Sequence, residues 1–464
     1  MAFVGAKRHE LDMTQGNIAG NLIRFAFPLL LGNLFQQLYN MVDTWVIGQW
    51  GLEAEYSAVG TVGPIINMLI GIFVGLSGGA GVVISTYFGA GNTKKVHDAV
   101  HTSVVMTLVL SVLFTVLGIA LTPVMLDLML QSKVEDSALL PYATTYLTIY
   151  FAGVVGLLVY NMGSGILRAV GDSKRPFYFL VVSAVLNIIL DIVFVVGFRM
   201  GVAGVALATV LAQLVSATLT VIVLLRTDSC VKLILKDLHV DFPMLGKIVR
   251  IGIPTALQLA ITAFSNVFVQ SYIGNINPIA HQTEHLGAWT TYAKLDQIMF
   301  LPPQSLSVAV MTFVGQNLGK GDVARAKKGA SIAYLQSSAI TAVVMIPLMV
   351  FAPQLSAFFN DSPLVVEYAT ILLRTLTPFY LVCSVNQIFS GALRGAGNTR
   401  APMINMLVAF VLFRQIYLFV MTNYISNDLI PVAMSYPAGW VLCCVLTLIT
   451  YFGFRFDKSR VMEK

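Results

Sequence analysis

The chain carries little charge. Only 11% of its 464 residues are Asp, Glu, Lys or Arg, whereas soluble domains average about 25%, and 57% are hydrophobic. It also has only four cysteines, Cys230, Cys383, Cys443 and Cys444, without framework spacing. We expect them to be reduced packing residues with no disulfide or metal role. The composition excludes an ordinary soluble fold and indicates an integral membrane protein.

Catalytic and nucleotide-binding motifs are missing as well. None of the six histidines lies in the middle of an apolar segment next to an acid, and no His-Glu-x-x-His occurs. The stretch from Gly315 to Gly321 lacks the spacing and the final Ser or Thr of a phosphate loop. The net charge of +6 is spread between apolar runs, so we expect no nucleic-acid partner. These absences argue against an enzyme and against an ATP-driven pump.

Long apolar segments dominate what is present. A membrane-spanning helix needs about 20 apolar residues, and twelve segments of this kind predict an all-α integral membrane protein with twelve transmembrane helices. The segments are 22–48, 57–83, 97–124, 139–163, 176–197, 202–226, 247–273, 286–315, 325–352, 367–391, 401–425 and 430–455.

The basic residues predict the orientation of these helices. The two termini and the even-to-odd loops, with their flanks, hold 23 of the 28 Lys and Arg residues, whereas the opposite loops hold only Lys133 and Arg199. Because basic residues collect on the cytoplasmic side, we expect both termini to be cytoplasmic. The predicted location is the plasma membrane, crossed many times.

A six-helix unit occurs twice along the chain. Pro28 has a counterpart at Pro254, 226 residues later, and the run 165–176 (Gly-Ile-Leu-Arg-Ala-Val-Gly-Asp-Ser-Lys-Arg-Pro) matches the run 391–402 at the same offset. Because six is an even number, both copies point the same way across the membrane. The repeat therefore predicts two six-helix lobes related by a pseudo-two-fold axis along the membrane normal.

The repeat also predicts the domain limits. A stretch rich in Lys and Asp separates the two copies and suggests a cytoplasmic linker. The predicted domains are an N-terminal lobe at 1–226, a linker at 227–246 and a C-terminal lobe at 247–464.

Two acids lie deep within apolar segments of the first lobe. Asp43 and Asp191 are the only acids inside its spans, and an Asp at a helix centre costs about 2.5–3.5 kcal/mol unless it is compensated. Helical spacing places each acid on or beside a polar stripe. The stripe of the first helix contains Asn33, Gln37, Asn40 and Thr44 with Gln36 on its flank, and that of the fifth contains Ser183 and Asn187.

These stripes predict a water-filled chamber that holds a cation or a proton. Burial and mutual repulsion raise the proton affinity of two neighbouring carboxylates. Oxygen donors from Asp43, Asn187 and Asp191 with a nearby hydroxyl would instead suit a hard cation such as Na⁺. The alternative interpretation is that these groups only hydrogen-bond one another between helices.

The same residues carry a resemblance to a known family. Pro28 with Val42-Asp43-Thr44, the runs 89–92 (Gly-Ala-Gly-Asn) and 167–172 (Leu-Arg-Ala-Val-Gly-Asp), and 187–191 (Asn-Ile-Ile-Leu-Asp) resemble the multidrug and toxic compound extrusion (MATE) transporters, most closely prokaryotic DinF-like and related branches. The resemblance covers nearly the whole chain. It implies two six-helix lobes around a central cleft and export of amphipathic, often cationic compounds in exchange for Na⁺ or H⁺. Thr209 matches the family's hydroxyl ligand position.

The second lobe lacks both acids. At the 226 offset Asp43 becomes Val269 and Asp191 becomes Tyr417, which argues against cation coupling there. A polar stripe in the seventh helix could line a neutral part of the substrate cavity. Its members include Gln258, Thr262 and Asn266.

Three charged residues remain in the second-lobe spans. Lys294 and Asp296 are two residues apart and do not share a helix face, so we expect each to pair with another helix. Arg414 lies in the middle of the eleventh segment. It could snorkel, pair with Asp296 or contact an anionic substrate, and pairing is the favoured interpretation.

The sequence thus predicts a secondary antiporter that works by alternating access. Ion and drug would compete for the same carboxylates, and Pro28 would serve as a hinge in the first helix, although a static kink is the alternative. We expect small-molecule substrates, Na⁺ or H⁺ as coupling ion, no other cofactor, a lipid bilayer around the chain and a monomer. The alternative function is a flippase for a lipid-linked or other amphiphile, with Arg414 and Lys294 binding anionic headgroups.

Overall fold

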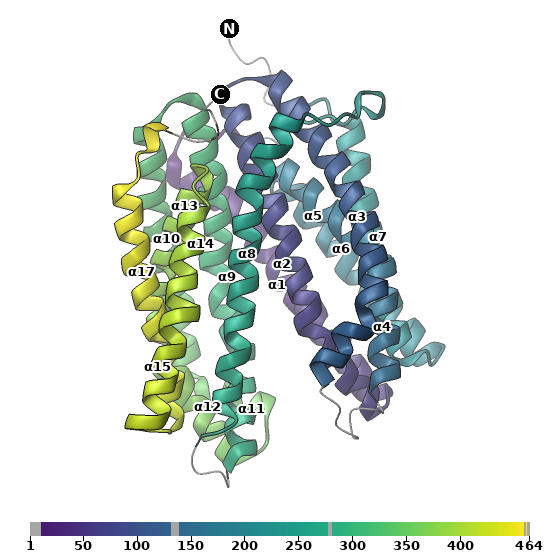
Figure 1. The fold of residues 1–464 in the computed structure, drawn as a ribbon, viewed down its shortest axis with the longest axis vertical. Helices are drawn as coiled ribbons and strands as arrows, with labels where there is room; N and C mark the ends of the chain where they lie inside the picture. The colour runs from purple at the N-terminus through teal and green to yellow at the C-terminus, as the bar shows by residue number, and fades with distance from the viewer. Residues whose placement is uncertain (1–10, 131–138, 277–280, 459–460, 462–464) are drawn as a thin grey trace. The chain divides into compact units, whose positions relative to one another are not determined.

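Helices make up the regular secondary structure of the part of the chain that is described. The structure is a computed structural model that describes residues 11–130, 139–276, 281–458 and 461 (Figure 1). Eleven of its helices are long and apolar enough to cross a membrane. Lys133, one of the two basic residues of the opposite loops, lies outside the described residues.

A bent pair of helices supplies a further span. The helices α4 (Leu140–Ala152) and α5 (Val154–Ala169) together pass as one apolar span with a 48° bend. The bend is at Gly153, where an added Cβ would lie 2.1 Å from Cγ1 of Val210. With this pair the described helices correspond to all twelve predicted segments, and the predicted all-α, twelve-helix membrane fold is confirmed.

The chain forms two compact units, each with its own helices. Unit 1 contains Phe27–Ile253 with Leu11 and Asp12, and unit 2 contains Met13–Ala26 and Pro254–Lys464. Besides α4 and α5, unit 1 holds most of α1 (Ile18–Trp50), α2 (Glu53–Gly89), α3 (Thr93–Leu130), α6 (Lys174–Asp191), the π-helix η2 (Ile192–Gly197), α7 (Gly201–Arg226) and the 3₁₀ turn η3 (Leu235–Asp237).

The helices of unit 2 are more often interrupted. They are most of α8 (Phe242–Ile273), then α9 (Gln282–Lys320), α10 (Val323–Val350), α11 (Ala352–Phe359), α12 (Pro363–Leu376), η5 (Thr377–Phe379), α13 (Tyr380–Gly395), α14 (Arg400–Met406), η6 (Leu407–Phe413), α15 (Arg414–Val420), η7 (Met421–Ile425), α16 (Leu429–Ala433), α17 (Ser435–Gly453) and η8 (Phe456–Lys458).

Two of the three places where the chain changes unit lie beside a proline inside a helix, and the third lies between Asp12 and Met13. Contacts change between Ala26 and Phe27 in α1, next to Pro28, and between Ile253 and Pro254 in α8. The prediction placed the boundary in the linker at 227–246. The contact units differ from this prediction because both helices are divided between the units. The first part of α1 packs with unit 2 and the rest with unit 1, whereas the first part of α8 packs with unit 1 and the rest with unit 2. The predicted lobe limits stay a prediction drawn from the repeat.

The backbone repeats the turns that the sequence repeat predicts. Gly171 and Gly397, 226 residues apart, have positive φ angles of 87° and 79°, which glycine adopts without steric cost. After each glycine, the N–H of the next residue donates to the carbonyl five positions back, at 3.0 and 2.9 Å. Two helices in corresponding places therefore end in the same way.

Helix packing follows the repeat as well. In unit 1, Ser77 of α2 donates to a carbonyl of α5 at 2.6 Å, and an added Cβ at Gly165 would lie 2.2 Å from Ser77 Oγ. In unit 2, Ser307 of α9 donates to a carbonyl of α13 at 2.7 Å, and an added Cβ at Gly391 would lie 2.6 Å from Ser307 Oγ. Both units thus bring the same pair of helices into close contact through a serine and a glycine.

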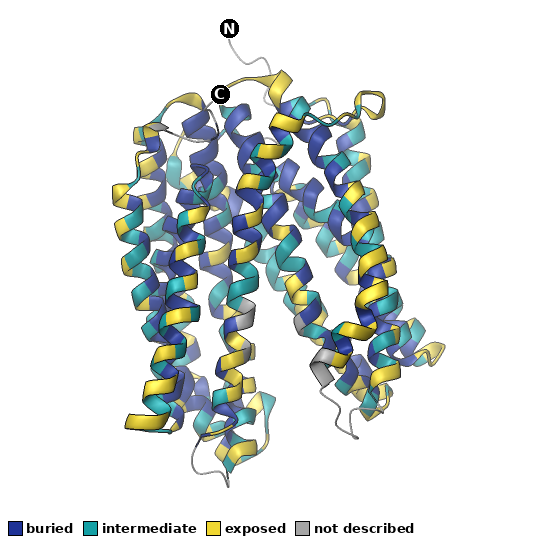
Figure 2. Cartoon of the chain, in the orientation of Figure 1, coloured by how far each residue is buried: buried dark blue, intermediate teal, exposed yellow. Residues whose placement is uncertain are grey.

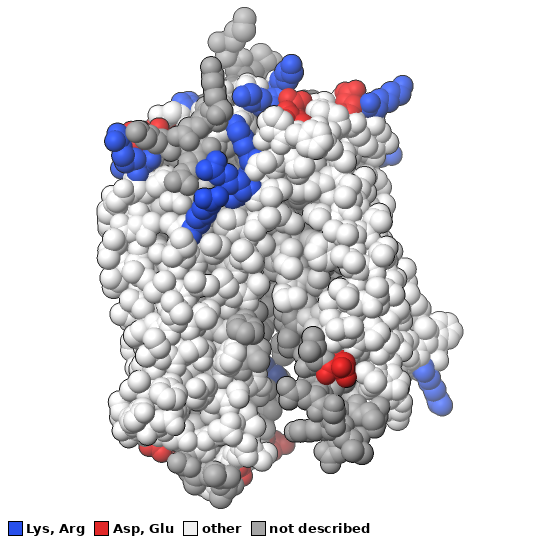
Figure 3. Space-filling model, in the orientation of Figure 1, with Lys and Arg blue, Asp and Glu red and all other residues white. Residues whose placement is uncertain are grey.

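Burial and charge follow the pattern of membrane helices. Dark blue, buried faces in Figure 2 lie where helices meet within a lobe, and large apolar side chains remain exposed elsewhere, as with Val112 at 67% and Ile449 at 65%. On the face drawn in Figure 3, most visible Lys and Arg side chains gather toward one end of the helices, with a largely uncharged surface between the ends. Exposed apolar faces of this extent suit a lipid surround.

The segment before α1 is fixed to unit 2 by hydrogen bonds to its backbone. Gln316 Oε1 accepts from the Met13 N–H at 3.0 Å, and Arg325 Nη2 donates to the carbonyls of Gln15 and Gly16, both at 2.9 Å. Met13 itself is fully buried. The beginning of α1 is therefore part of the folded core of unit 2.

Replacing Arg325 with Ala should release this segment. Hydrogen bonds from a charged donor contribute about 1.5–3 kcal/mol, so we expect the free energy of unfolding to fall by ~2 kcal/mol. Hydrogen–deuterium exchange should become faster over Met13–Ala26. Lys328→Ala, a change at an exposed position of the same helix, is the control and should leave exchange unchanged. Equal exchange in both variants would contradict the anchoring role.

Candidate functional site

The two predicted acids meet inside unit 1. Asp43 of α1 is 9% exposed and Asp191 of α6 is fully buried. Their carboxyl groups lie within hydrogen-bonding reach of each other. Among the described residues, no donor reaches Asp43 Oδ1 or either oxygen of Asp191. Because two ionised carboxylates can only accept hydrogen bonds, this pair requires a shared proton or a cation.

A third buried acid of unit 1 shows the contrast. Glu55 of α2 is 8% exposed, but its two oxygens accept hydrogen bonds from the backbone N–H groups of Val202 at 3.1 Å and Leu52 at 2.9 Å. Glu55 therefore caps helix ends and has its charge compensated by donors. In the Asp43–Asp191 pair, by contrast, three of the four oxygens accept no hydrogen bond from the described residues.

The end of helix α6 sets the position of Asp191. Asn187 and Asp191 lie one turn apart on its buried face, whereas Ile189 is 51% exposed. Immediately after Asp191 the chain continues as the π-helix Ile192–Gly197. Such wide turns shift the register of a helix and are frequent at functional sites.

Asn187 of α6 and Thr209 of the neighbouring helix α7 offer further oxygen atoms. Asn187 is 1% exposed, and neither its Oδ1 nor its Nδ2 has a partner among the described residues. Thr209, 8% exposed, lies on α7, which packs against α6, and its hydroxyl donates to the Val205 carbonyl at 3.0 Å, which leaves its oxygen able to accept or to ligate. The arrangement offers carboxylate, amide and hydroxyl oxygens, a donor set that hard cations prefer.

Tyrosines surround the acids, and sequence reasoning missed them. Tyr39 of α1 and Tyr146 of α4 both interact electrostatically with Asp43, and Tyr146 also with Asp191. Tyr150 lies one turn beyond Tyr146, with ring centroids 6.3 Å apart, and faces the side chain of Gln213. The spacing of Tyr146 and Tyr150 in the fourth predicted segment is the signal that could have found them. Aromatic side chains near carboxylates are a combination that suits organic cations.

The other predicted residues of the first-lobe stripes differ in exposure and in partners, and their role as cavity lining stays a prediction. Asn40 and Thr44 are exposed, and Thr44 donates to the Asn40 carbonyl at 2.9 Å. Ser183 donates to the Ala212 carbonyl of α7 at 2.8 Å, so it joins two helices. The remaining predicted cavity residues are half-buried on α1: Asn33, Gln36 and Gln37.

Unit 2 has apolar packing where unit 1 has its acids. Val269, the counterpart of Asp43, is fully buried in the hydrophobic core, and Tyr417, the counterpart of Asp191, donates to the Pro431 carbonyl at 3.1 Å. Gln258, predicted to line the cavity, is 1% exposed and accepts from Arg394 at 3.2 Å. Its predicted role as a cavity-lining residue stays a prediction.

The other predicted residues of α8 differ in exposure. The Thr262 hydroxyl donates to the Gln258 carbonyl at 3.0 Å and is half-buried. Asn266 is exposed and accepts a hydrogen bond from the Tyr436 hydroxyl at 2.9 Å. Of the three, Asn266 remains the one open to a ligand.

The favoured pairing of Arg414 with Asp296 is wrong. Among the described residues no carboxylate lies within salt-bridge distance of Arg414. Asp296 instead accepts from the hydroxyl of Tyr292, one turn away on α9, at 3.0 Å. Lys294 is exposed and lies over the ring of Phe359 at 5.3 Å, so it does contact another helix. In place of the expected ion pairs, Arg414 lies over the rings of Phe410 and Tyr436, and Lys294 lies over the ring of Phe359.

The fold and the acid pair together define a helical membrane protein with buried carboxylates. Comparison with known proteins shows its family. The MatE family model matches residues 28–193 and 254–420, one match in each half of the chain. The chain therefore belongs to the MATE family, which comprises transporters rather than enzymes. The resemblance stated from the sequence motifs is confirmed at the level of the family.

Relatives and solved structures agree over nearly the full length. The chain is 28% identical to a probable multidrug resistance protein, YpnP, of Bacillus subtilis over 87% of this chain and 88% of that protein, and 26% identical to the probable multidrug resistance protein NorM of Thermotoga maritima over 96% and 95%. It resembles an outward-facing multidrug resistance MATE transporter of the MOP superfamily with a TM-score of 0.89 at 22% identity, covering 98% of each chain. That likeness shows a shared fold.

Proposed function

We propose that the protein is a secondary antiporter that exports amphipathic, cationic organic compounds in exchange for Na⁺ or H⁺. The observation that carries the proposal is the buried Asp43–Asp191 pair, in which three of the four carboxylate oxygens have no hydrogen-bond partner in the described part of the chain. Intramembrane acids are retained where they bind ions or substrates, because their burial is costly. Membership of a family of multidrug efflux transporters supports the same activity.

Exchange follows from competition for one pair of charges. An ion at Asp43 and Asp191 neutralises the pair, and a cationic compound then loses its electrostatic attraction to the site. When the ion leaves, the restored negative charge and the faces of Tyr146 and Tyr150 favour an organic cation. Because both ligands need the same carboxylates, each displaces the other, and alternating access converts this displacement into antiport.

A hinge beside Pro28 would link ion binding at Asp43 to a change in the shape of helix α1. Pro28 removes a backbone hydrogen bond inside α1, fifteen residues before Asp43, at the place where α1 changes from one contact unit to the other. A helix weakened there can bend when the charge on Asp43 changes.

We also propose that both termini are cytoplasmic, as the distribution of Lys and Arg favours, and that the protein acts as a monomer in the plasma membrane.

The coupling ion can be identified with purified protein in proteoliposomes. Efflux of ethidium, an aromatic cation, would be measured under an imposed Na⁺ gradient and, separately, under an imposed proton gradient. We expect one of the two gradients to accelerate efflux at least tenfold over gradient-free vesicles. Acceleration by neither gradient would refute antiport.

The flippase alternative has less support from the geometry. A headgroup-binding cleft needs a cluster of basic side chains, whereas Lys294 is exposed beside Phe359 and Arg414 is 1% exposed. The uncompensated acids of unit 1 would repel an anionic headgroup.

A further inference from the structure

Arg414 carries a buried positive charge that no described carboxylate neutralises. It is 1% exposed and lies directly after the π-helix Leu407–Phe413, which has no counterpart in the corresponding α-helical part of α6. Its guanidinium lies over the rings of Phe410 at 4.6 Å and Tyr436 at 4.3 Å, and its Nε has no hydrogen-bond partner. A cation is thus held in place by aromatic faces.

Aromatic faces compensate a buried charge only in part. Cation–π contacts are individually weak, and together they stabilise a cation by less than it loses when it is removed from water. Arg414 Nη1 also donates to Ser265 Oγ at 3.1 Å, but that oxygen is neutral. The positive charge of Arg414 is therefore not fully compensated, and the site favours binding of an anion.

Asn266 occupies the place where that negative charge would be bound. Its Oδ1 accepts from the Tyr436 hydroxyl at 2.9 Å and from Arg414 Nη1 at 3.5 Å, the longest distance that still counts as a hydrogen bond. Asn266 is exposed, so its side chain can swing aside. One full positive charge and one hydroxyl thus converge on a neutral, movable oxygen at the surface of unit 2.

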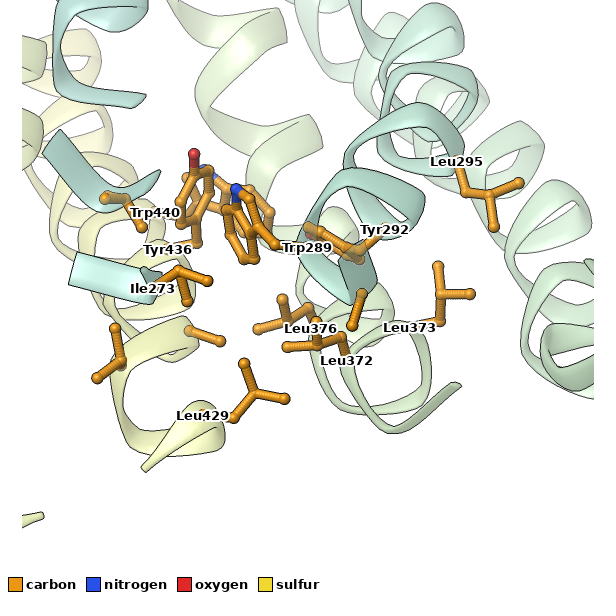
Figure 4. Close-up of a cluster of buried hydrophobic side chains, with 14 of the residues drawn as sticks. Ile273, Trp289, Tyr292, Leu295, Leu372, Leu373, Leu376, Leu429, Tyr436 and Trp440 are labelled. Atoms are coloured by element: carbon orange, nitrogen blue, oxygen red, sulfur yellow. The ribbon is translucent and has the colours of Figure 1, made fainter. Parts of the chain in front are cut away.

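We propose that Arg414 and Tyr436 form an anion-binding site in unit 2 that takes the carboxylate of an amphipathic aromatic acid, with Ser265 holding the guanidinium in place and Asn266 as the movable cover of the site. A carboxylate matches the planar guanidinium fork and would replace the Asn266 oxygen between the same two donors. The Trp289 ring lies 5.3 Å from that of Tyr436 and the Trp440 ring 5.8 Å, so Tyr436 is held by the buried apolar cluster of unit 2 (Figure 4).

This site differs in charge and in place from the acid pair of unit 1. It adds organic anions, or the acidic group of a zwitterion, to the compounds that the protein binds. Because its test measures binding to purified protein without a gradient, its outcome does not depend on whether antiport is driven by Na⁺ or H⁺.

The test compares 1-naphthoate with 1-naphthamide, which has the same shape without the charge. Equilibrium dialysis against purified protein in a neutral detergent should give at least tenfold tighter binding of the naphthoate. Asn266→Asp should abolish this preference and raise the melting temperature, because the new carboxylate neutralises Arg414 itself. Asn266→Ala should keep or strengthen naphthoate binding, because the cover is gone.

Asn423→Asp adds the same charge at an exposed asparagine of η7 and is the matched control, which should bind naphthoate as the parent protein does. Equal affinity for the two probes, or unchanged naphthoate binding by Asn266→Asp, would overturn the proposal. Binding that is retained in phosphatidylcholine nanodiscs and lost in phosphatidylglycerol nanodiscs would also overturn it, since a lipid headgroup would then be the occupant.

Discussion

Asp43→Asn should abolish ion-coupled efflux while leaving the protein folded. The substitution keeps the shape of the side chain, but it removes one of two charges for which ion and substrate compete. We expect ethidium efflux from proteoliposomes under the effective gradient to fall at least a hundredfold, to the rate of empty vesicles. The melting temperature should not fall, because an Asn amide can donate a hydrogen bond to Asp191 where two carboxylates repelled each other.

A control substitution at an exposed acid shows whether the loss of efflux comes from the acid pair or from the removal of any negative charge. Asp127→Asn alters an exposed acid of α3 in the same unit and should retain full efflux. Asp191→Asn should behave like Asp43→Asn, because the two side chains hold one ion together. Gradient-driven efflux at the parental rate in Asp43→Asn would remove the acid pair from the mechanism.

Gly79→Ala should prevent most of the protein from folding. A Cβ at this position of α2 would lie 2.6 Å from the backbone nitrogen of Gly252 and 2.7 Å from the carbonyl oxygen of Ile248, so backbone atoms of α8 would have to move. Such overpacking costs about 3 kcal/mol or more, a large part of the stability of a typical protein. The yield of monodisperse protein after extraction in detergent should fall at least fivefold.

The neighbouring glycine provides a control for this effect. An added Cβ at Gly78 meets no atom within 4 Å, so Gly78→Ala should express and melt as the parent protein does. Both variants add one methyl group to the same helix. If Gly79→Ala were extracted and melted like Gly78→Ala, the close approach of α2 and α8 would not be needed for folding.

Much of the fold could be predicted because membrane helices follow a local rule. The length and apolarity of a segment decide whether it can span a bilayer, and all twelve predicted segments correspond to spans in the structure. The internal repeat could also be predicted from the sequence, and in the structure Gly171 and Gly397 lie at equivalent turns. The high cost of an intramembrane acid singled out Asp43 and Asp191 without any knowledge of their neighbours.

The sequence by itself thus determined the class of fold, the repeat and the two acids that carry the proposed function. The tertiary structure decided that Asp43 and Asp191 meet, that Tyr39 and Tyr146 surround them and that the segment Met13–Ala26 belongs to unit 2. It also decided that the guanidinium of Arg414 lies over the rings of Phe410 and Tyr436 and that none of the described acids pairs with it. Hydropathy and spacing report on one helix at a time, whereas the partner of a buried charge depends on how different helices rotate and pack against one another.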